Sequence, residues 1–337
     1  MKKRVLYIGN ALSNKGATIT SIETLGNYLK EEGFEVKTAS SFKNKGLRLL
    51  DMMYAVLRYS KKTDYVIIDT YSTSNYWYAV IVGKLCSYLS IPYVPILRGG
   101  NLPQRLKNSP NTTQSLFGKA MINIYPSAYL GSFFEKAGFT NLKYVPNTIE
   151  IKNYSYIKRD VVRPKLLWVR SFDSIYNPMM ALHVLEELLK EYPEASLTMV
   201  GPAKDESYDA CYAFAKAQEL PVTFTGLLSK EAWIDLAPSH DIFISTTNFD
   251  NTPVSVIEAM ALGLPVVSTD VGGMPFLIEN KKDGLLCPAN NVEPFVDCLS
   301  SLLSTPELVQ HIAENARIKA ETFDWNVVKK HWEEVLS

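Results

Sequence analysis

The sequence predicts an α/β protein built from two doubly wound parallel-sheet domains. Short β-branched runs alternate with longer helical patterns, which is typical of a parallel sheet with helices on both faces. The alternation stops at residues 147–164, a stretch of mixed charge without apolar periodicity, and then resumes. A length of 337 residues exceeds what one core usually needs and suits two domains of about 150 residues each.

The first half contains six short apolar runs with helical patterns between them. The N-terminal run, RVLYIG, is short and apolar on both faces, as expected of a buried strand. The predicted strands are 4–9, 35–40, 64–70, 92–97, 121–126 and 142–147, and the predicted helices are 18–32, 46–60, 74–90 and 127–138.

The second half repeats this organisation, and a helical segment follows each apolar run. We place the linker at 147–164, because the residues after Pro146 and Asn147 show neither a helix pattern nor a strand pattern. An amphipathic helix in the last fifteen residues comes too late to belong to the regular winding of either sheet. The predicted strands are 165–170, 196–201, 222–226, 241–246 and 265–269.

Composition argues for a protein of a reducing compartment that does not span a membrane. The four cysteines include no C-x-x-C pair, which disfavours a zinc site or a disulfide scaffold. The N-terminal apolar run is too short for a signal peptide, and Tyr76 to Leu89 is too short to cross a bilayer. We therefore expect a cytoplasmic protein.

A net charge of zero hides a strong asymmetry between the halves. Residues 1–150 contain 19 Lys and Arg against 9 Asp and Glu, a balance of +10, and residues 151–337 contain 16 against 26, a balance of −10. The basic half predicts an anionic partner, such as a phospholipid surface or a phosphorylated substrate. Mutual attraction of the two halves explains the same asymmetry.

The segment 250–278, DNTPVSVIEAMALGLPVVSTDVGGMPFLI, predicts helix, strand and second helix. Pro253 suits the first helical position, Asn251 or Thr252 suits the cap, and Gly263 suits the C-terminal stop after Leu262. Nearly every residue between them is apolar, which predicts a helix buried on most of its surface.

Glu258 is the exception in this apolar helix. A lone buried carboxylate is unfavourable unless something hydrogen-bonds it, and a polar ligand arriving from a cleft is the simplest partner. Asp250 precedes the helix start, where backbone amides and the helix dipole favour an anion. The two carboxylates are thus predicted to bracket a helix N-terminus.

Several loops after strands carry charge or glycine, and such loops line the ligand crevice of open parallel sheets. Arg98 and Arg170 each close an apolar strand, where a charge requires solvent or an anion. Gly16 lies before the first helix, and Gly272 and Gly273 lie before a later one, where bare backbone can approach a phosphate or sugar. The dinucleotide pattern G-x-G-x-x-G is absent.

Taken together, these motifs resemble the retaining glycosyltransferases of family 4, along essentially the whole chain. The family has two glutamates separated by seven residues, then A-x-G-x-P-V-V and a double glycine; here the pattern is Asp250-x7-Glu258, ALGLPVV and Gly272-Gly273. VPNTIE at 145–150 resembles the interdomain turn. The resemblance implies the GT-B fold of two facing Rossmann-like domains, with the C-terminal helix crossing back to the first. The expected domains are 1–150 with 323–337, on the acceptor side, and 151–322, on the donor side.

The resemblance also implies roles for particular residues. Glu258 would hold the ribose of a sugar nucleotide, Asp250 would lie near the donor sugar, and Arg170 would neutralise the diphosphate. Gly16 would let the first loop approach that diphosphate, and no metal or other cofactor would be needed, since no Asp-x-Asp is present. Further residues expected in the donor pocket are Asn251, Thr252, Pro253, Val254, Gly272 and Gly273.

Three positions depart from the family pattern. Asp250 replaces a glutamate, Asn177 stands where a lysine is common, and Arg98 occupies the end of the fourth strand in place of a histidine. The positive charge of that lysine, which would bind phosphate, is therefore missing at Asn177. We hypothesise that Arg98 returns this charge, so that Arg98→Ala would lower turnover with little change in folding.

The expected function is transfer of a hexose-type sugar from a nucleoside diphosphate to a hydroxyl acceptor, with retention, in cell-surface polysaccharide or glycolipid assembly. The alternatives are a non-catalytic nucleotide- or carbohydrate-binding protein and a sugar-nucleotide epimerase. No nucleic-acid partner is expected. Segment 43–62 has basic ends and an apolar middle, which suits either a helix packed on the sheet or peripheral contact with an anionic membrane face.

Overall fold

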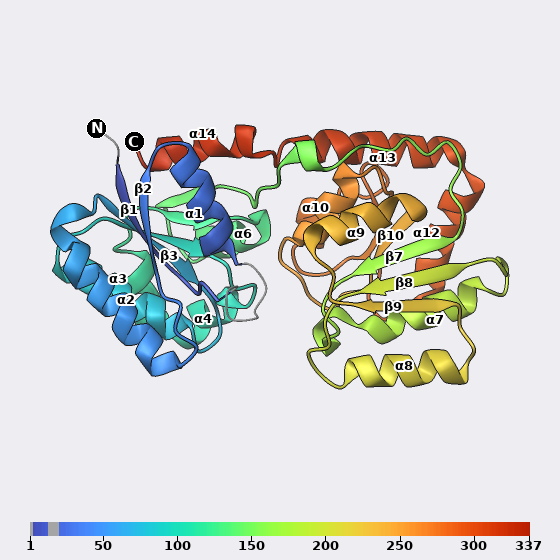
Figure 1. Cartoon of the computed structure of the whole chain (residues 1–337), viewed down its shortest axis with the longest axis horizontal. Helices are drawn as coiled ribbons and strands as arrows, with labels where there is room; N and C mark the ends of the chain where they lie inside the picture. Colours follow the sequence, from blue (N-terminus) through green and yellow to red (C-terminus); the bar gives the residue numbers. More distant parts are fainter. Residues whose placement is uncertain (1–2, 13–19) are drawn as a thin grey trace. The chain divides into compact units, whose positions relative to one another are not determined.

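The protein is described here by a computed structural model of residues 3–12 and 20–337 (Figure 1). The chain forms two compact units, one of Met1–Pro146 with Lys329–Ser337 and the other of Asn147–Val328. The sequence placed the corresponding boundaries after residues 150 and 322.

The first unit contains a six-stranded sheet in the order β2-β1-β3-β4-β5-β6, in which every neighbouring pair is parallel. β1, β3 and β4 are buried almost throughout, because helices cover both faces of a parallel sheet. The strands are β1 (Arg4–Ile8), β2 (Glu35–Ala39), β3 (Tyr65–Thr70), β4 (Tyr93–Leu97), β5 (Asn123–Tyr125) and β6 (Leu142–Tyr144).

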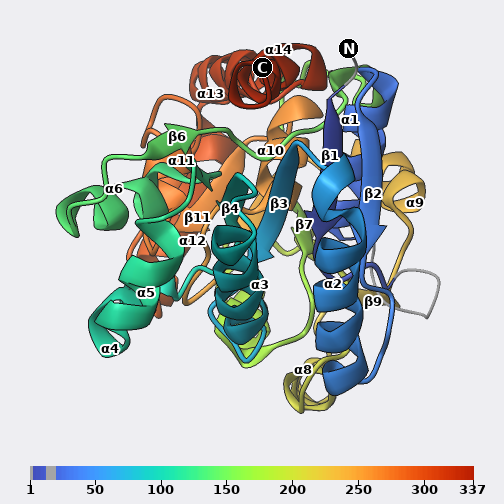
Figure 2. The same ribbon diagram turned by 90° about the vertical axis from the view of Figure 1, so that its left-hand side faces the viewer.

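The helices of the first unit lie on both faces of this sheet. Figure 2 shows α2 and α3 side by side on one face, and α2, α3 and α5 enclose a core there with β1 and β3. Residues 102–117 form two short helices that the sequence reading left out. The helices are α1 (Ser21–Glu31), α2 (Lys45–Tyr59), α3 (Tyr76–Tyr88), α4 (Leu102–Asn108), α5 (Pro110–Phe117) and α6 (Ala128–Lys136).

The end of the chain belongs to the first unit, as the GT-B architecture requires. This end, Lys329–Ser337, includes most of α14 (Trp325–Val335). Two ion pairs join it to the end of α1 and to β6. Lys329 pairs with Glu32 at 3.0 Å, and Lys143 pairs with Glu334. The expected return of the C-terminal helix to the first unit is therefore confirmed for residues 329–337, whereas residues 323–328 belong to the second unit.

The second unit repeats the doubly wound design, with the order β12-β11-β10-β7-β8-β9 and parallel pairing throughout. The edge strand β12 was missing from the sequence prediction. The strands are β7 (Lys165–Val169), β8 (Ser196–Val200), β9 (Val222–Gly226), β10 (Ile242–Ser245), β11 (Val266–Thr269) and β12 (Leu285–Cys287).

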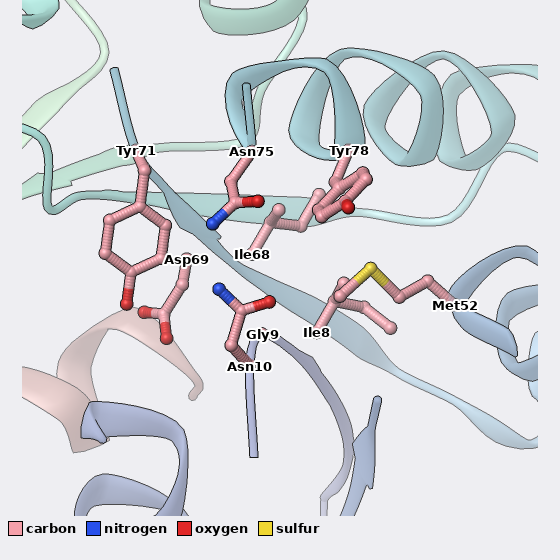
Figure 3. A pocket seen from close by; sticks show the side chains of 9 residues that line it. All are labelled: Ile8, Gly9, Asn10, Met52, Ile68, Asp69, Tyr71, Asn75 and Tyr78. Atoms are coloured by element: carbon pink, nitrogen blue, oxygen red, sulfur yellow. The ribbon is translucent and has the colours of Figure 1, made fainter. Parts of the chain in front are cut away.

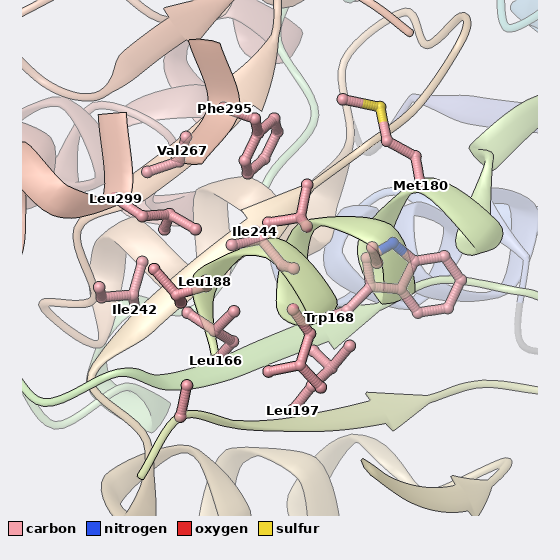
Figure 4. Packing of buried hydrophobic residues seen from close by; sticks show 14 of the residues in the cluster. Leu166, Trp168, Met180, Leu188, Leu197, Ile242, Ile244, Val267, Phe295 and Leu299 are labelled. Carbon is pink, nitrogen blue, oxygen red and sulfur yellow. The ribbon is translucent and has the colours of Figure 1, made fainter. Parts of the chain in front are cut away.

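Two hydrophobic cores lie on the two faces of the second sheet. In one, Trp168, Leu197 and Ile244 pack against the helices α7, α8 and α12 (Figure 4). The other lies beneath α9, α10 and α13. The helices are α7 (Pro178–Leu188), α8 (Ser207–Ala217), α9 (Lys230–Leu236), α10 (Val254–Ala261), α11 (Met274–Leu277), α12 (Val292–Ser304) and α13 (Pro306–Glu321).

The strand order fixes which loops can form a site. β7 pairs with β10 in the second unit, so the loops that follow these strands emerge next to each other at the carboxyl edge of the sheet. Open parallel sheets bind ligands at such a switch in strand order. Arg170 follows β7 and Asp250 follows β10, so these two charges meet there.

Candidate functional site

The loop between β10 and α10 is held in place by threonines at the strand end. Thr246 donates to the carbonyl of Asn177 at 2.9 Å and accepts from the Trp168 indole at 3.2 Å. Thr247 donates to the carbonyl of Phe249 at 2.9 Å. These bonds pin a segment without regular structure, so Asp250 stands on a rigid support.

Asp250 and Arg170 form an ion pair at this edge of the second sheet. The second oxygen of Asp250, Oδ1, accepts from the backbone amide of Asn251 at 2.7 Å. The Arg170 guanidinium lies 4.9 Å from the centre of the Tyr176 ring, an attractive cation–π geometry. Both charged side chains are mostly buried, at 21% and 13% exposed. Arg170 and Asp250, two site residues predicted from the sequence and 80 positions apart, are thus brought into contact by the fold.

Glu258 is buried inside α10, as its apolar surroundings predicted, and is only 3% exposed. The Tyr154 hydroxyl donates to its Oε1 at 2.7 Å, and the Lys230 ammonium contacts the same oxygen. Among the described residues none donates to Oε2. One side of the carboxylate is therefore satisfied by the protein, and the other retains an acceptor for a ligand.

Lys230 and Tyr154 are functional candidates that the sequence reading missed. Lys230 is the first residue of α9, and its side chain is 53% exposed. Tyr154 lies in the predicted linker and is buried. Neither has a local signal, because their partner Glu258 is 28 residues from Lys230 and 104 from Tyr154.

Two arginines satisfy the C-terminal end of α10. Arg159 donates to the carbonyls of Leu262 and Gly263 at 3.3 and 3.0 Å, and Arg317 donates to that of Ala261 at 2.6 Å. Positive charge at a helix C-terminus complements the dipole. The opposite end, with its free amides, is the end nearest to Asp250 in the sequence.

The N-terminal residues of α10 follow the prediction closely in position. Pro253 is the cap and Val254 is the first helical residue, one later than expected. The carbonyl of Thr252 accepts from the Asn147 amide at 3.3 Å. The buried Asn251 Oδ1 and Ser255 Oγ have no hydrogen-bond partner in the described part of the chain. This turn therefore holds unused polar atoms beside the Asp250–Arg170 pair.

Gly272 and Gly273 have a packing reason for being glycine. A Cβ at Gly273 would lie 1.7 Å from the carbonyl oxygen of Asn251, and one at Gly272 would lie 2.3 Å from that of Asp250. Gly272 also has a φ of +55°, which disfavours larger residues. The Gly273 amide donates to the Asp250 carbonyl at 2.8 Å. The double glycine therefore lets its own backbone touch the Asp250 loop.

Asn177 lies in the left-handed region, with a φ of 48°, at the cap of α7. Its amide donates to Asn290 Oδ1 at 2.9 Å and approaches Asn248 Oδ1 at 3.4 Å. The residue is thus part of a neutral amide cluster. It adds no charge beside Arg170.

Arg98 lies in the first unit, just after β4, and pairs with the buried Asp69 of β3 at 3.1 Å. Tyr7 donates to the same Asp69 oxygen at 3.0 Å. Burial raises the pKa of the Asp69 carboxyl, and the Arg98 guanidinium opposes this shift. Burial also raises the pKa of Tyr7 well above its usual range. The charge of Arg98 is therefore balanced inside the first unit.

A small cavity beside this pair contains further polar groups. It has a volume of about 10 Å³, and Asn10, Asp69, Tyr71 and Asn75 point toward one another around it (Figure 3). Within the part of the chain that the structure describes, Asp69 Oδ2 is buried there without a hydrogen-bond partner. The predicted residue Gly16 lies outside the described residues.

Two further properties bear on the chemistry that the chain can support. Over residues 3–12 and 20–337, no three His, Cys, Asp or Glu residues are grouped in a way that could hold a metal ion. In the same ranges, no helix is long and apolar enough to span a bilayer. The cations that the structure shows beside the two carboxylates are Arg170 at Asp250 and Lys230 at Glu258.

Known proteins resemble part of this chain in sequence. Residues 157–319 match the family model of glycosyl transferases group 1. An uncharacterized glycosyltransferase of Haemophilus influenzae is 31% identical over 156 residues, which cover 46% of this chain and 44% of that protein. The sulfoquinovosyl transferase of Arabidopsis thaliana is 30% identical over 150 residues, 43% of this chain and 28% of that protein. The chain thus spans less than half the length of these curated relatives.

Structural similarity extends over both units. The crystal structure of Anabaena HepE in complex with UDP matches with a TM-score of 0.76 at 17% identity, covering 100% of this chain and 99% of that one. Identity this low shows the fold alone, which is GT-B. Residues 157–319, which make up most of the second unit, are similar to the glycosyl transferases of group 1.

Proposed function

We propose that the protein is a retaining glycosyltransferase that moves a hexose-type sugar from a nucleoside diphosphate to a hydroxyl acceptor without a metal ion. The observation that carries the proposal is the half-satisfied carboxylate of Glu258, which is buried yet has no donor to Oε2 among the described residues. An acceptor that the protein leaves unused in a mostly buried carboxylate can take a hydrogen bond from a ligand. A ribose hydroxyl is such a donor.

The leaving group in this proposal is the nucleoside diphosphate. Its negative charge grows as the bond to the anomeric carbon breaks, so prearranged positive groups lower the barrier. Arg170 is held against Tyr176, and Lys230 stands with its ammonium half in solvent beside Glu258. In the proposal, these two cations supply the positive charge that the family lysine, replaced here by Asn177, would otherwise add.

Asp250 has a defined role in the proposal. It pairs with Arg170 and lies next to the start of α10, where sugar hydroxyls would bind the backbone of residues 251–254. On donor binding, the guanidinium exchanges part of this contact for phosphate oxygens. The acceptor proton passes to the departing phosphate on the same face, so the reaction requires no protein base.

A second candidate function is nucleotide binding without transfer. The pairing of Arg170 with Asp250 favours it, because the charge needed by the leaving group already has a partner within the protein. Asn177 adds no replacement charge. The two candidates differ in one measurable respect, which is turnover of the donor.

The test begins with thermal unfolding of the full chain in the presence of UDP, GDP, ADP and CMP sugars. A ligand that binds the folded state raises the free energy of unfolding by RT ln(1 + [L]/Kd). UDP compounds come first, because the HepE structure contains UDP. We expect one nucleotide class to raise the melting temperature, and a flat response to all four would refute donor binding.

The preferred donor then separates an enzyme from a passive binder. We expect slow hydrolysis of that donor, with release of the sugar in its α configuration from an α-linked donor. Binding without hydrolysis, and without transfer to lipid-linked or soluble saccharides, would favour the second candidate. For the acceptor we propose a saccharide of cell-surface polysaccharide or glycolipid assembly, which the net basic first half suits.

A further inference from the structure

The outer face of α2 is apolar, although its inner face already packs in the core. Its buried residues, which include Met52, Ala55 and Val56, face the core of the first unit. A helix with one apolar side packed on a sheet normally turns a polar side to water. On α2 the exposed residues instead include four large apolar ones, Leu47, Leu50, Tyr54 and Leu57, which are 52%, 62%, 57% and 53% exposed.

The spacing of these residues puts them on one stripe. Successive gaps of three, four and three positions follow the helix period, so the four side chains lie along a single line. In the same unit, α1 exposes Thr24, Asn27, Lys30 and Glu31. The apolar stripe of α2 therefore contrasts with the polar exposed side of α1.

The segment before α2 adds an exposed aromatic residue, and hydrogen bonds hold its backbone. Phe42 is 43% exposed. The buried Arg48 guanidinium donates to the carbonyls of Phe42 at 2.7 Å and Lys43 at 3.0 Å. Asn44 caps the helix by accepting from the amides of Gly46 and Leu47. The buried Arg48 thus fixes the backbone of Phe42 and Lys43, whose side chains are exposed.

Basic side chains surround the stripe. Residues 41–63 contain six Lys and Arg and one acidic residue, Asp51. All of the basic residues except Arg48 are exposed. We call Phe42, Leu47, Leu50, Tyr54 and Leu57, with Lys43, Lys45, Arg58, Lys61 and Lys62, the α2 outer surface.

We propose that the α2 outer surface docks on an anionic lipid bilayer. An amphipathic helix binds the interface of a bilayer through its apolar side, and basic side chains at its margins bind lipid phosphates. A second copy of the chain fits less well, because a two-fold contact would bring five exposed cations against five others. The proposal goes beyond sugar transfer and does not depend on it.

The test is cosedimentation of the full chain with vesicles. One set contains equal parts of phosphatidylglycerol and phosphatidylcholine, and the other contains phosphatidylcholine alone. We expect binding to the anionic set only, and weaker binding as salt rises and screens the charges. Each of the changes Lys61→Ala and Lys62→Ala is expected to weaken binding about fivefold.

The apolar stripe is tested by the double variant Leu50→Glu/Leu57→Glu, which should no longer sediment with anionic vesicles. Its matched control is Ile318→Glu/Tyr212→Glu, which makes the same charge change at helical positions of the second unit that are 64% and 54% exposed. Because all four residues are exposed, both variants should fold, and an unchanged melting temperature checks this.

Four outcomes would overturn the proposal. The chain could fail to bind either kind of vesicle, or it could bind both equally. The double variant could bind as well as the control. Sedimentation equilibrium could show a dimer that only Leu50→Glu/Leu57→Glu disrupts, which would assign the surface to a second copy. Thermal shift by nucleotide is measured on the same variants, so a failure here is separate from a failure of the proposed function.

Discussion

Two buried carboxylates, Asp69 in the first unit and Glu258 in the second, have the same kind of neighbours and different access to ligands. Each accepts from a tyrosine hydroxyl and an adjacent cation through a single oxygen. The cation beside Asp69 is Arg98, whose side chain is 13% exposed, whereas Lys230 beside Glu258 is 53% exposed. Asp69 Oδ2 is enclosed in a cavity of about 10 Å³.

The difference teaches that burial alone does not mark a ligand site. Asp69 and Arg98 neutralise each other inside the fold, so removing one leaves the other without compensation. Glu258 is paired with a cation that water can solvate, and its second oxygen is open to a ligand. We therefore infer that the first carboxylate serves mainly stability and the second mainly binding, and four predictions test this contrast.

The largest effect is expected from Arg98→Ala. It leaves the buried Asp69 carboxylate unpaired, which should lower the free energy of unfolding by about 3–5 kcal/mol, as measured by urea titration. Arg4→Ala is the control, because the Arg4–Asp64 pair is exposed and such a pair contributes about 0–1 kcal/mol. Normal stability with lost turnover would instead support the hypothesis that Arg98 acts on the donor phosphate.

Glu258→Gln should give the next largest effect, and on binding. Loss of a hydrogen bond to a charged acceptor, about 1.5–3 kcal/mol, corresponds to nucleotide binding about 10- to 150-fold weaker, as measured by calorimetry. Unfolding should change little, since Lys230 is solvated and the amide still accepts from Tyr154. Glu279→Gln, at an exposed pair with Lys282, is the control. A large loss of stability with unchanged affinity would make Glu258 structural, like Asp69.

Lys230→Met is expected to have a smaller effect that depends on phosphate. A half-exposed cation contributes about 0.2–1 kcal/mol to a contact with an anion, so affinity for the nucleoside diphosphate should fall a few-fold. Affinity for the nucleoside should stay the same. Lys282→Met is matched in exposure, since both lysine side chains are 53% exposed. Equal losses for nucleoside and diphosphate would show that Lys230 acts only by positioning Glu258.

The smallest effect concerns pH and Asp69. Burial raises the pKa of this carboxyl above its ordinary 3.8, so the folded state holds the proton more tightly than the unfolded state does. The free energy of unfolding should therefore fall as pH rises from 3.8 through the raised pKa. Asp69→Asn should lack this contribution, which urea titrations at several acidic pH values can resolve. Identical pH slopes in the two proteins would contradict the assignment.

Much of the fold could be predicted because it depends on local pattern. The apolar period of two or 3.6 positions identified eleven of the twelve strands within the described residues, and the lone charged residue in 254–261 identified Glu258 as a buried carboxylate. Gly263, with a φ of +75°, ends α10 as its position after the apolar run predicted. The short helices α4 and α5 and the strand β12 have too few residues to show a period.

Pairing between distant residues was decided by the tertiary structure. Local sequence marks Glu258, Asp250 and Arg170 as unusual, but Lys230 and Tyr154 look like an exposed helix start and a linker tyrosine. Only the packing of α9 and the linker around α10 brings their donors to one oxygen of Glu258. Likewise, only the neighbouring positions of β7 and β10 join Arg170 to Asp250. The sequence by itself determined which charges need a partner, because an apolar stretch of sequence shows that a charge within it will lose its water. The tertiary structure decided which partner each charge has, because contact between distant residues depends on how the helices and strands pack.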